Sequence, residues 1–324
     1  EILKPGASPD EISEGSLRCD NLDCQMRYPI VDGIPIIVLD PAALLVAQPA
    51  ALQLPLSPGT QALLVAGSTD DAPLARLLEH LSIYLDAHYG DRSQPPPDGP
   101  IAGWGGAELF SAVARLGARP DQPSPLKSGR AVELGCSVGR GLLALSGGAE
   151  LSIGIDLHLG ALRAARRILD GEGLAYARRV IGRHYQSAQL ALPAAPGVQL
   201  ICADVLDPPL APGAFMRVVA TNLLDSVRTP RQLLSVIDGL CAPDGDVLLA
   251  SPYSWQSGVV EESGRIGGVA PGPELRRIFE TGDGLESAYT IVEERELPWH
   301  LRRDARSAHS YLVHTLLGRK TASR

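Results

Sequence analysis

The sequence predicts an α/β fold in which a doubly wound parallel sheet follows a small N-terminal β-hairpin module. Three observations support this prediction. Five apolar, strand-like segments alternate with helical patterns between residues 131 and 251. Glycine or acidic residues follow several of these segments at their carboxyl ends, where sheets of this kind bind ligands. Near the N-terminus, Asp32-Gly33 joins two short strand-like segments, which is typical of a tight hairpin.

The first predicted strand ends in a glycine-rich turn. Residues 131–141 read Ala-Val-Glu-Leu-Gly-Cys-Ser-Val-Gly-Arg-Gly, and a helical pattern follows. Glycine allows positive φ and lets a ligand approach the backbone closely, which a Cβ would prevent. The free N–H groups of the following helix face a ligand above the turn. We therefore expect the turn to form part of a cofactor site with Glu133, Gly135, Cys136, Ser137 and Gly139.

Acidic and amide residues follow three other predicted strands. Asp156 ends the strand 151–155 and lies 21 residues after Gly135, the spacing of an acidic residue that binds a ribose diol. Asp204 lies at the end of a third strand (198–205), where it is placed to accept a hydrogen bond from an adenine amine. Because parallel strands end at one edge of a sheet, we expect one nucleoside site there, completed by Leu157, Val205 and Asn222.

The glycine pattern distinguishes two classes of nucleoside ligand. Dinucleotide-binding proteins use Gly-x-Gly-x-x-Gly to admit a pyrophosphate, whereas this chain has Glu-x-Gly-x-Ser-x-Gly. The pattern resembles motif I of class I S-adenosylmethionine (SAM)-dependent methyltransferases, although Ser137 stands where a glycine is usual. The resemblance implies a Rossmann-like, seven-stranded sheet that ends in an antiparallel pair, here residues 290–296 and 310–317. It also implies SAM as cofactor and S-adenosylhomocysteine as product.

Composition excludes several partners. The chain of 324 residues has 29 basic and 37 acidic residues, a net charge of −8, so it has no general electrostatic attraction to nucleic acid and an RNA or DNA substrate would need a local basic patch. Five cysteines, an odd number in a long chain, do not predict a disulfide framework and favour a cytoplasmic location. The uncharged run 41–69 contains several prolines, so we expect no membrane span. Nothing in the sequence indicates the oligomeric state.

Residues 1–40 form the predicted N-terminal module. Its second half, Tyr-Pro-Ile-Val-Asp-Gly-Ile-Pro, is similar to the zinc-ribbon module of the methyltransferase-activator family. Structural zinc requires four ligands, and such modules carry two cysteine pairs. Only Cys19 and Cys24 are present, and residues 1–18 contain no cysteine or histidine. We therefore expect an incomplete metal site in a vestigial or truncated ribbon, without tightly bound zinc.

Residues 41–130 form a predicted helical connector, and residues 131–324 the main domain. Apolar spacing predicts helices over 72–87 and 107–116. In the family that motif I resembles, helices at this place cover the SAM cleft, which makes His88, Tyr89 and Trp104 candidates for a lid; packing against the main domain is the alternative. We interpret residues 171–197 as an insertion that contains a further helix.

A closer resemblance covers roughly residues 80–320. The chain is similar to the methyltransferase domain of ovothiol synthases, which N-methylate a thiol-histidine. The matching segments are Tyr84 with His88-Tyr89-Gly90, Gly135–Arg140, Asn222-Leu223-Leu224-Asp225, Ser251-Pro252-Tyr253-Ser254-Trp255, Gly267-Gly268, and Leu297-Pro298-Trp299 with Arg302, Ala305 and Arg306. The resemblance implies a small, polar substrate whose nitrogen or sulfur accepts the methyl group, such as an amino acid or a histidine derivative.

Five residues are candidates for orienting that substrate: Asn222, Tyr253, Trp255, His300 and Arg302. Arg302 is placed to pair with a substrate carboxylate through its fork of donors. Core packing of Trp255 and surface exposure of His300 or Arg302 are equally compatible with the sequence. Two other functions stay open: methylation of a protein, peptide or RNA, and a non-catalytic SAM-binding subunit that docks through residues 1–40.

Overall fold

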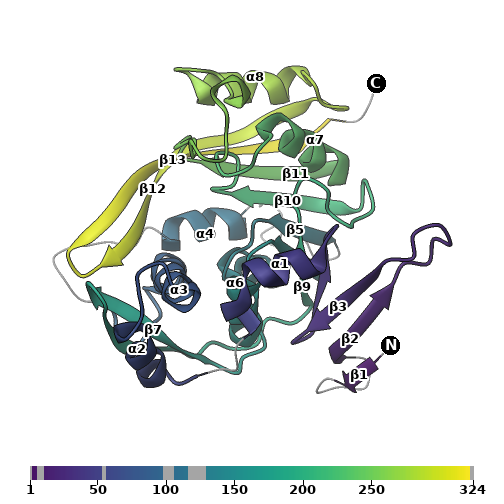
Figure 1. Cartoon of the computed structure of the whole chain (residues 1–324). Coiled ribbons are helices and arrows are strands. Elements are labelled where there is room, and N and C mark those ends of the chain that lie inside the picture. Colours follow the sequence, from purple (N-terminus) through teal and green to yellow (C-terminus); the bar gives the residue numbers. More distant parts are fainter. Residues whose placement is uncertain (1, 6–10, 53–55, 98–105, 116–128, 322–324) are drawn as a thin grey trace.

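One sheet runs through the molecule (Figure 1). The computed structural model describes residues 2–5, 11–52, 56–97, 106–115 and 129–321, so the lid candidate Trp104 lies outside the described residues. In spatial order, the strands of the sheet are β1 (Ile2–Pro5), β2 (Ile12–Arg18), β3 (Arg27–Val31), β4 (Ile34–Ile37), β9 (Val198–Ala203), β6 (Leu151–Asp156), β5 (Arg130–Leu134), β10 (Phe215–Thr221), β11 (Cys241–Ser251), β13 (Ser307–Lys320) and β12 (Tyr289–Asp304).

The six central strands, β4, β9, β6, β5, β10 and β11, are parallel to one another, whereas β1 to β3 at one side and β13 and β12 at the other pair antiparallel. The predicted α/β fold with a parallel central sheet is therefore confirmed. β6 and β9 lie on one side of β5, whereas β10 and β11 lie on its other side. The connection from β9 to β10 therefore reverses the direction in which strands are added to the sheet. Ligands of doubly wound sheets bind at such a reversal, beyond the carboxyl ends of the strands.

The predicted count of seven strands is not confirmed, because the N-terminal strands extend the same sheet. Ile36 and Ile37 of β4 pair with Cys202 and Ala203 of β9. Asp32 and Gly33 have positive φ (51° and 73°), as a two-residue hairpin requires, and confirm the predicted turn between β3 and β4. The side chains of Ile34 and Ile36 are fully buried against the main domain, which explains why these strands join the sheet.

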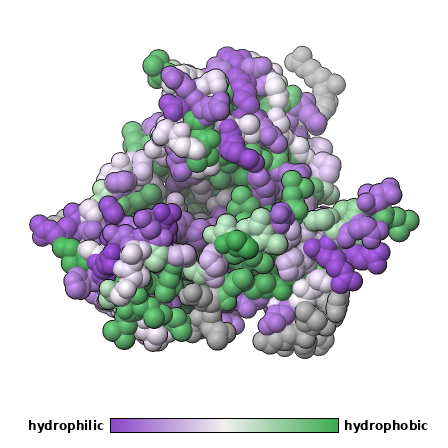
Figure 2. Space-filling model, viewed as in Figure 1, coloured by the Kyte–Doolittle hydropathy of each residue, from purple (hydrophilic) through white to green (hydrophobic). Residues whose placement is uncertain are grey.

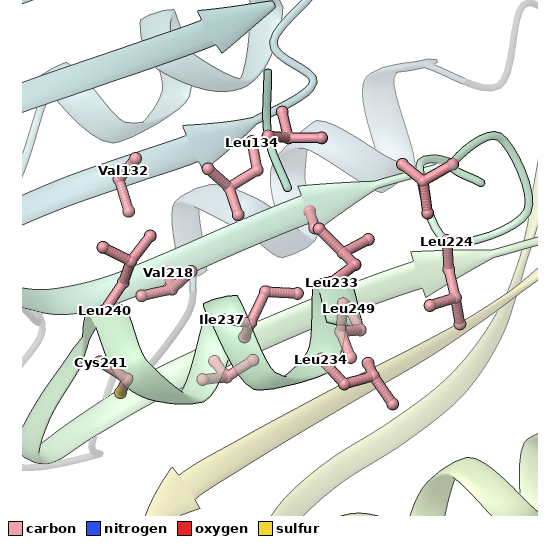
Figure 3. Packing of buried hydrophobic residues seen from close by; sticks show 14 of the residues in the cluster. Val132, Leu134, Val218, Leu224, Leu233, Leu234, Ile237, Leu240, Cys241 and Leu249 are labelled. Carbon is pink, nitrogen blue, oxygen red and sulfur yellow. The ribbon is translucent and has the colours of Figure 1, made fainter. Parts of the chain in front are cut away.

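Helices cover both faces of the sheet. In the described residues they are α1 (Pro41–Ala47), α2 (Pro58–Ala66), α3 (Pro73–Tyr89), α4 (Gly106–Arg115), α5 (Arg140–Ser146), α6 (Leu159–Leu169), α7 (Pro230–Leu240) and α8 (Pro271–Thr281), with 3-10 turns at Pro49–Leu52 and Glu262–Gly264. On one face, α7 and α8 pack against alternate residues of β5, β10 and β11, and Figure 3 shows Leu233, Leu234 and Ile237 of α7 directed at Val218 and Leu249. The intervening strand residues pack against α4, α5 and α6 on the other face.

Residues 171–197 do not form the predicted helix. They form a two-stranded hairpin, β7 (Leu174–Ile181) and β8 (His184–Leu190), separate from the main sheet. Tyr176, Ala188 and Leu190 are buried, and their apolar cluster includes residues of α3 and α6. Arg178 is fully buried on the same face of β7 as Tyr176, so a charged residue interrupts the apolar alternation that marks a strand; Gly182 (φ 54°) lies between the strands.

The hairpin of β12 and β13 is longer than predicted and reaches beyond the carboxyl edge of the sheet. Figure 1 shows it curving away from β11 toward β7 and α2. At its tip, Ala305 N donates to Val180 O of β7 at 2.8 Å. Together with α3, this hairpin surrounds the carboxyl ends of the parallel strands. Among the helices of the described ranges, none combines the length and apolar composition needed to cross a membrane.

Candidate cofactor and active site

The strand register brings the predicted ligand residues to one edge. Leu134 of β5 pairs with Ile155 of β6 and with Ala220 of β10. One position further along, Asp156 pairs with Cys202, and Thr221 pairs with Ala250. The residues that leave these strands are therefore neighbours at the carboxyl edge: Gly135, Leu157, Asp204, Asn222 and Ser251.

The glycine turn adopts the backbone conformation that its sequence predicts. Gly135 and Gly139 have φ of 73° and 81°, and Ser137 also has a positive φ, 48°. A Cβ at Gly135 would lie 2.9 Å from Leu223 Cδ1, so the loop after β10 packs directly on the turn. Positive φ in a residue other than glycine costs about 1–3 kcal/mol and is concentrated at functional sites. The strained Ser137 thus lies at the predicted ligand position.

Asp156 fixes the turn from the neighbouring strand. Its carboxylate accepts hydrogen bonds from Ser137 N at 2.9 Å and from His158 N at 2.8 Å. Burial raises the pKa of Asp156 above its ordinary value, and the two backbone donors partly offset that rise. Each carboxylate oxygen has a further lone pair, so the pair of oxygens can still accept from a ligand diol. Leu157 beside it is 40% exposed, an apolar surface at the same edge.

Glu133 and Cys136 lie behind the turn rather than above it. Glu133 is 1% exposed; it accepts from Thr221 Oγ1 at 3.4 Å and from the backbone of Leu142 at the start of α5. Burial raises the pKa of Glu133 to about 8. Cys136 is fully buried beside Gly154. Only backbone atoms of these two residues are therefore placed for ligand contact, and Glu133 acts on the site by holding α5 against β5.

Three side chains near this edge carry buried polar atoms without a partner. Among the described residues, Ser137 Oγ, Asn222 Oδ1 and Arg140 Nη1 are buried without a hydrogen-bond partner. Asn222 also has positive φ (53°), and its N donates to Ala250 O at 2.7 Å. Buried polar groups are nearly always hydrogen-bonded in proteins. The three atoms therefore fit polar groups of a ligand bound at the turn.

Asp204 and Val205 form the far side of the edge. Asp204 Oδ1 accepts from Leu206 N at 2.9 Å, and Arg228 Nη2 lies 3.7 Å from Oδ2. Asp204 is half-buried, whereas Val205 is buried in the core on the α7 face. The carboxylate of Asp204 is thus available to a ligand, and Val205 contributes mainly packing.

Helix α3 lies over the turn. Tyr89 Oη donates to Val138 O at 3.1 Å, and Arg140 lies over the Tyr89 ring. Burial raises the pKa of Tyr84, and the charges of Asp156 and Asp225, with Tyr311 of β13, raise it further. His88 is buried against Phe110 and Trp299, where burial lowers its pKa to about 3, so it packs α3 onto the main domain.

The predicted substrate residues lie in two places. Tyr253 and Trp255 follow β11 with positive φ of 53° and 29°, and Ser254 N donates to Asp225 Oδ2 at 2.8 Å. This bond joins the loops after β10 and β11 beside Asn222. His300 lies on β12, half-buried, with its Nδ1 2.9 Å from Ser310 Oγ.

Arg302 is not available as a carboxylate anchor. Its side chain is 1% exposed, and Nη1 donates to Asp86 Oδ2 at 3.0 Å and to Arg179 O at 3.2 Å. Arg302 therefore pairs with a carboxylate of the protein itself, Asp86, and not with a substrate carboxylate. Two residues that sequence analysis missed, Glu294 and His314, lie instead beside Tyr253: His314 Nδ1 is 2.6 Å from Tyr253 Oη, and His314 Nε2 is 2.8 Å from Glu294 Oε1. The strand pattern of residues 310–317 placed His314 on a strand but did not indicate its neighbours.

Cys19 and Cys24 lie together in the loop after β2, where a hydrogen bond links the two thiols. In the part of the chain that the structure describes, no group of three or more histidine, cysteine, aspartate or glutamate side chains is arranged to hold a metal ion.

Comparison with known proteins identifies the class of this site. Residues 132–249, which run from β5 to β11, match the protein family described as "Methyltransferase domain". This segment contains the glycine turn, Asp156, Asp204 and Asn222. Residues 132–249 therefore form a domain of the SAM-dependent methyltransferase class, whose cofactor is SAM. A comparison with curated proteins found no match.

Several solved structures are similar in fold. The N-methyltransferase NodS of Bradyrhizobium japonicum, in complex with S-adenosylhomocysteine, has 15% identity and a TM-score of 0.46; the match covers 76% of this chain and 100% of that one. A chain of the complex between the Haloferax volcanii Trm112 methyltransferase activator and a putative methyltransferase has 15% identity and a TM-score of 0.44, covering 68% and 90%. The tRNA (m1A58) methyltransferase of Aquifex aeolicus has 13% identity and a TM-score of 0.39, covering 70% and 72%.

Proposed function

We propose that this chain is an enzyme that transfers a methyl group from SAM to a nitrogen, or a sulfur, of a small polar substrate such as an amino-acid or histidine derivative. The observation that carries the proposal is the enclosure of the carboxyl edge. Three elements far apart in sequence surround it: α3, the β7–β8 hairpin and the β12–β13 hairpin (Figure 1). An edge surrounded in this way favours a small acceptor over a macromolecule.

One buried carboxylate ties the enclosing elements together. Asp86 of α3 accepts from Arg178 Nε and Tyr176 Oη of β7, both at 2.8 Å, and from Arg302 Nη1 of β12 at 3.0 Å. Buried pairs of this kind are strongly destabilised when one partner is removed. The enclosure is therefore a built part of the fold, and a tRNA or a folded protein would have to displace it to reach the turn.

The cofactor contacts follow from the geometry of the edge. Asp156 would receive the ribose hydroxyls, Leu157 would pack on the adenine and Asp204 would accept from its amino group. Ser137 Oγ and Asn222 Oδ1 would bind polar groups of the amino-acid part, since neither has a partner among the residues that the structure describes. Bound SAM supplies an electrophilic methyl group on a sulfonium. The remaining task of the chain is to align the acceptor and exclude water, which can supply much of the rate.

The segments that resemble ovothiol synthases support the choice of substrate. The loops 222–225 and 251–255, which carry two of those segments, are joined by the bond between Ser254 N and Asp225. We propose that the acceptor lies between the loop 251–255 and the β12–β13 hairpin, where His300 is placed to orient it. Arg302 has no part in this proposal, because its guanidinium already forms a buried ion pair with Asp86.

A second candidate is a role in which the N-terminal part docks on another protein. Figure 2 shows apolar surface over α1 and α2, where Val46, Leu63 and Leu64 are exposed. Leu22 and Leu39 are also exposed, at 82% and 92%. The exposed apolar surface over α1 and α2 favours an interaction site there. Docking of this kind is compatible with catalysis or with a non-catalytic SAM-binding subunit.

Turnover with three classes of acceptor distinguishes these functions. We would measure S-adenosylhomocysteine formation from SAM with a panel of histidine derivatives and small thiols, with a peptide library and with tRNA, each against a reaction without acceptor. We expect product with small acceptors only. Product with tRNA or peptides alone would contradict the small-substrate proposal. Tight binding of S-adenosylhomocysteine without turnover of any acceptor would favour the non-catalytic subunit.

A further inference from the structure

Three side chains form a continuous hydrogen-bonded chain beside the loop after β11. Tyr253 Oη lies 2.6 Å from His314 Nδ1, and His314 Nε2 lies 2.8 Å from Glu294 Oε1. The residues come from a loop and from two strands, β13 and β12. His314 pairs across the sheet with Ser251, the last residue of β11, so the chain begins at the carboxyl edge that carries the cofactor turn.

The protons of this chain can be assigned from its surroundings. Burial raises the pKa of Tyr253, and the charges of Glu296, Glu294 and Asp225 raise it further, so the phenol is protonated and donates to His314 Nδ1. Although burial acts in the opposite direction, hydrogen bonds from His314 and Arg276 hold the pKa of Glu294 below its ordinary value. The carboxylate is therefore ionised. His314 then carries its proton on Nε2 and donates it to Glu294, and Nδ1 is the acceptor.

The elements packed around His314 bring few other charges to it. Its ring faces Gly272 of α8, where a Cβ would lie 3.6 Å away, and the ring of Tyr253 stacks on it. Arg276 of α8 reaches Glu294 at 2.8 Å, and Glu296 lies directly across from His314 on β12. Asp225, from the loop after β10, acts on Tyr253. The positive φ of Tyr253 and of Trp255 shows that the loop is held in a costly conformation, which is typical of residues at active sites.

We propose that Tyr253, His314 and Glu294 form a proton relay that removes a proton from the methyl acceptor. The proposal rests on the proposed function and adds a substrate class to it: an amine, imidazole N–H or hydroxyl, which loses a proton on methylation, rather than a thiolate. Tyr253 is the residue that contacts the acceptor. His314 and Glu294 act through Tyr253.

The step balances as follows. The acceptor heteroatom forms a bond to the methyl carbon as the carbon–sulfur bond of the sulfonium breaks, and the bonding pair goes to sulfur. The proton of the acceptor passes to Tyr253 Oη, whose own proton passes to His314 Nδ1. The resulting imidazolium is stabilised by the ionised Glu294, to which its Nε2–H remains bonded. General-base assistance of this kind contributes about 10²–10⁴-fold in rate.

The test combines kinetics with a spectroscopic measurement on the full chain. Using the small acceptor with the highest turnover in the panel, we would measure kcat and KM from pH 5 to 9 for wild type, Tyr253→Phe and Glu294→Gln. Tyr253→Phe should lower kcat about 100-fold with little change in KM. Glu294→Gln removes the charge that stabilises the imidazolium, so kcat should fall and the acidic limb of the profile should move to lower pH. His309→Gln, an exposed histidine on the same strand, should behave like wild type.

Nitrogen-15 NMR of the histidine side chains, recorded with S-adenosylhomocysteine bound, separates the relay from a purely structural role. We expect the Nε2–H tautomer for His314 in wild type and a changed Nε2 signal in Glu294→Gln, where the charged acceptor is lost. A normal kcat in Tyr253→Phe, or an acidic limb that Glu294→Gln leaves in place, would overturn the relay while the methyltransferase function stands. Absence of turnover with every acceptor, with this tautomer intact, would overturn the proposed function and the relay with it.

Discussion

Asp86 and Arg302 form an ion pair in the interior, although 216 residues separate them in the sequence. Nη1 of Arg302 lies 3.0 Å from Oδ2 of Asp86, and the exposed fractions of the two side chains are 1% and 0%. The second oxygen of Asp86 accepts from Arg178. A single carboxylate thus connects the helix over the cofactor turn to both hairpins that surround it.

Arg302→Ala should therefore destabilise the protein rather than simply weaken substrate binding. Removing one partner of a buried ion pair typically costs about 3–5 kcal/mol. Arg303→Ala is the matched control, since Arg303 is 56% exposed in its pair with Glu79 and such pairs contribute at most about 1 kcal/mol. Urea denaturation of the three proteins measures both effects. Equal free energies of unfolding for the two variants would contradict the structural role of Arg302.

Glu133 should make stability depend on pH. Burial raises its pKa from 4.5 to about 8, so between these values the folded state holds a proton that the unfolded state has lost. Stability from this group is present below about pH 4.5 and is lost as pH rises through about 8. In Glu133→Gln this loss disappears.

The difference in free energy of unfolding between wild type and Glu133→Gln should thus change over that interval. The free energy of unfolding of wild type should fall relative to the variant by no more than about 5 kcal/mol. Parallel urea titrations at several pH values give this difference. A difference that stays constant from pH 4.5 to 8 would show that Glu133 is ionised in the folded protein.

The purified chain should hold less than one zinc ion, because Cys19 and Cys24 supply two of the four ligands that structural zinc requires. Metal analysis after dialysis against a chelator provides the measurement, with Cys19→Ser as the control. One zinc per chain that resists the chelator would reveal further ligands and would contradict this expectation.

Gly141→Ala should disturb the cofactor site indirectly. A Cβ at Gly141 would overlap the carboxylate of Glu133, so either this buried side chain or α5 would have to shift, and the packing of α5 beside the turn would change. Gly147→Ala at the other end of α5 meets nothing within 4 Å and serves as the control. We expect weaker binding of S-adenosylhomocysteine and a lower melting temperature for Gly141→Ala alone. Wild-type affinity in that variant would show that the turn does not depend on the packing of α5.

Local patterns sufficed for much of this architecture. The glycine turn, Asp156 and Asp204 occur at strand ends that apolar runs mark clearly, and the register then places them at one edge without further information. The hairpin of residues 174–190 was predicted as a helix because the buried Arg178 interrupts the apolar alternation that begins with Leu174 and Tyr176.

Contacts across long sequence separations could not be predicted in the same way. The sequence around Arg302 is compatible with a substrate anchor. Only the fold shows that the Arg302 side chain is paired with Asp86. Likewise, His314 and Tyr253 are 61 residues apart and meet because β13 returns beside β11. Local propensity contains no information on such pairings, which depend on the strand order of the complete sheet.

The affinity of S-adenosylhomocysteine for wild type and Asp156→Ala, measured by calorimetry, tests most directly the claim that the cofactor binds at this edge. Loss of hydrogen bonds to a charged acceptor should weaken binding by about 1.5–3 kcal/mol. Asp207→Ala, an exposed aspartate in the loop after β9, should bind like wild type. An unchanged affinity in Asp156→Ala, with folding intact, would contradict the assignment of the site.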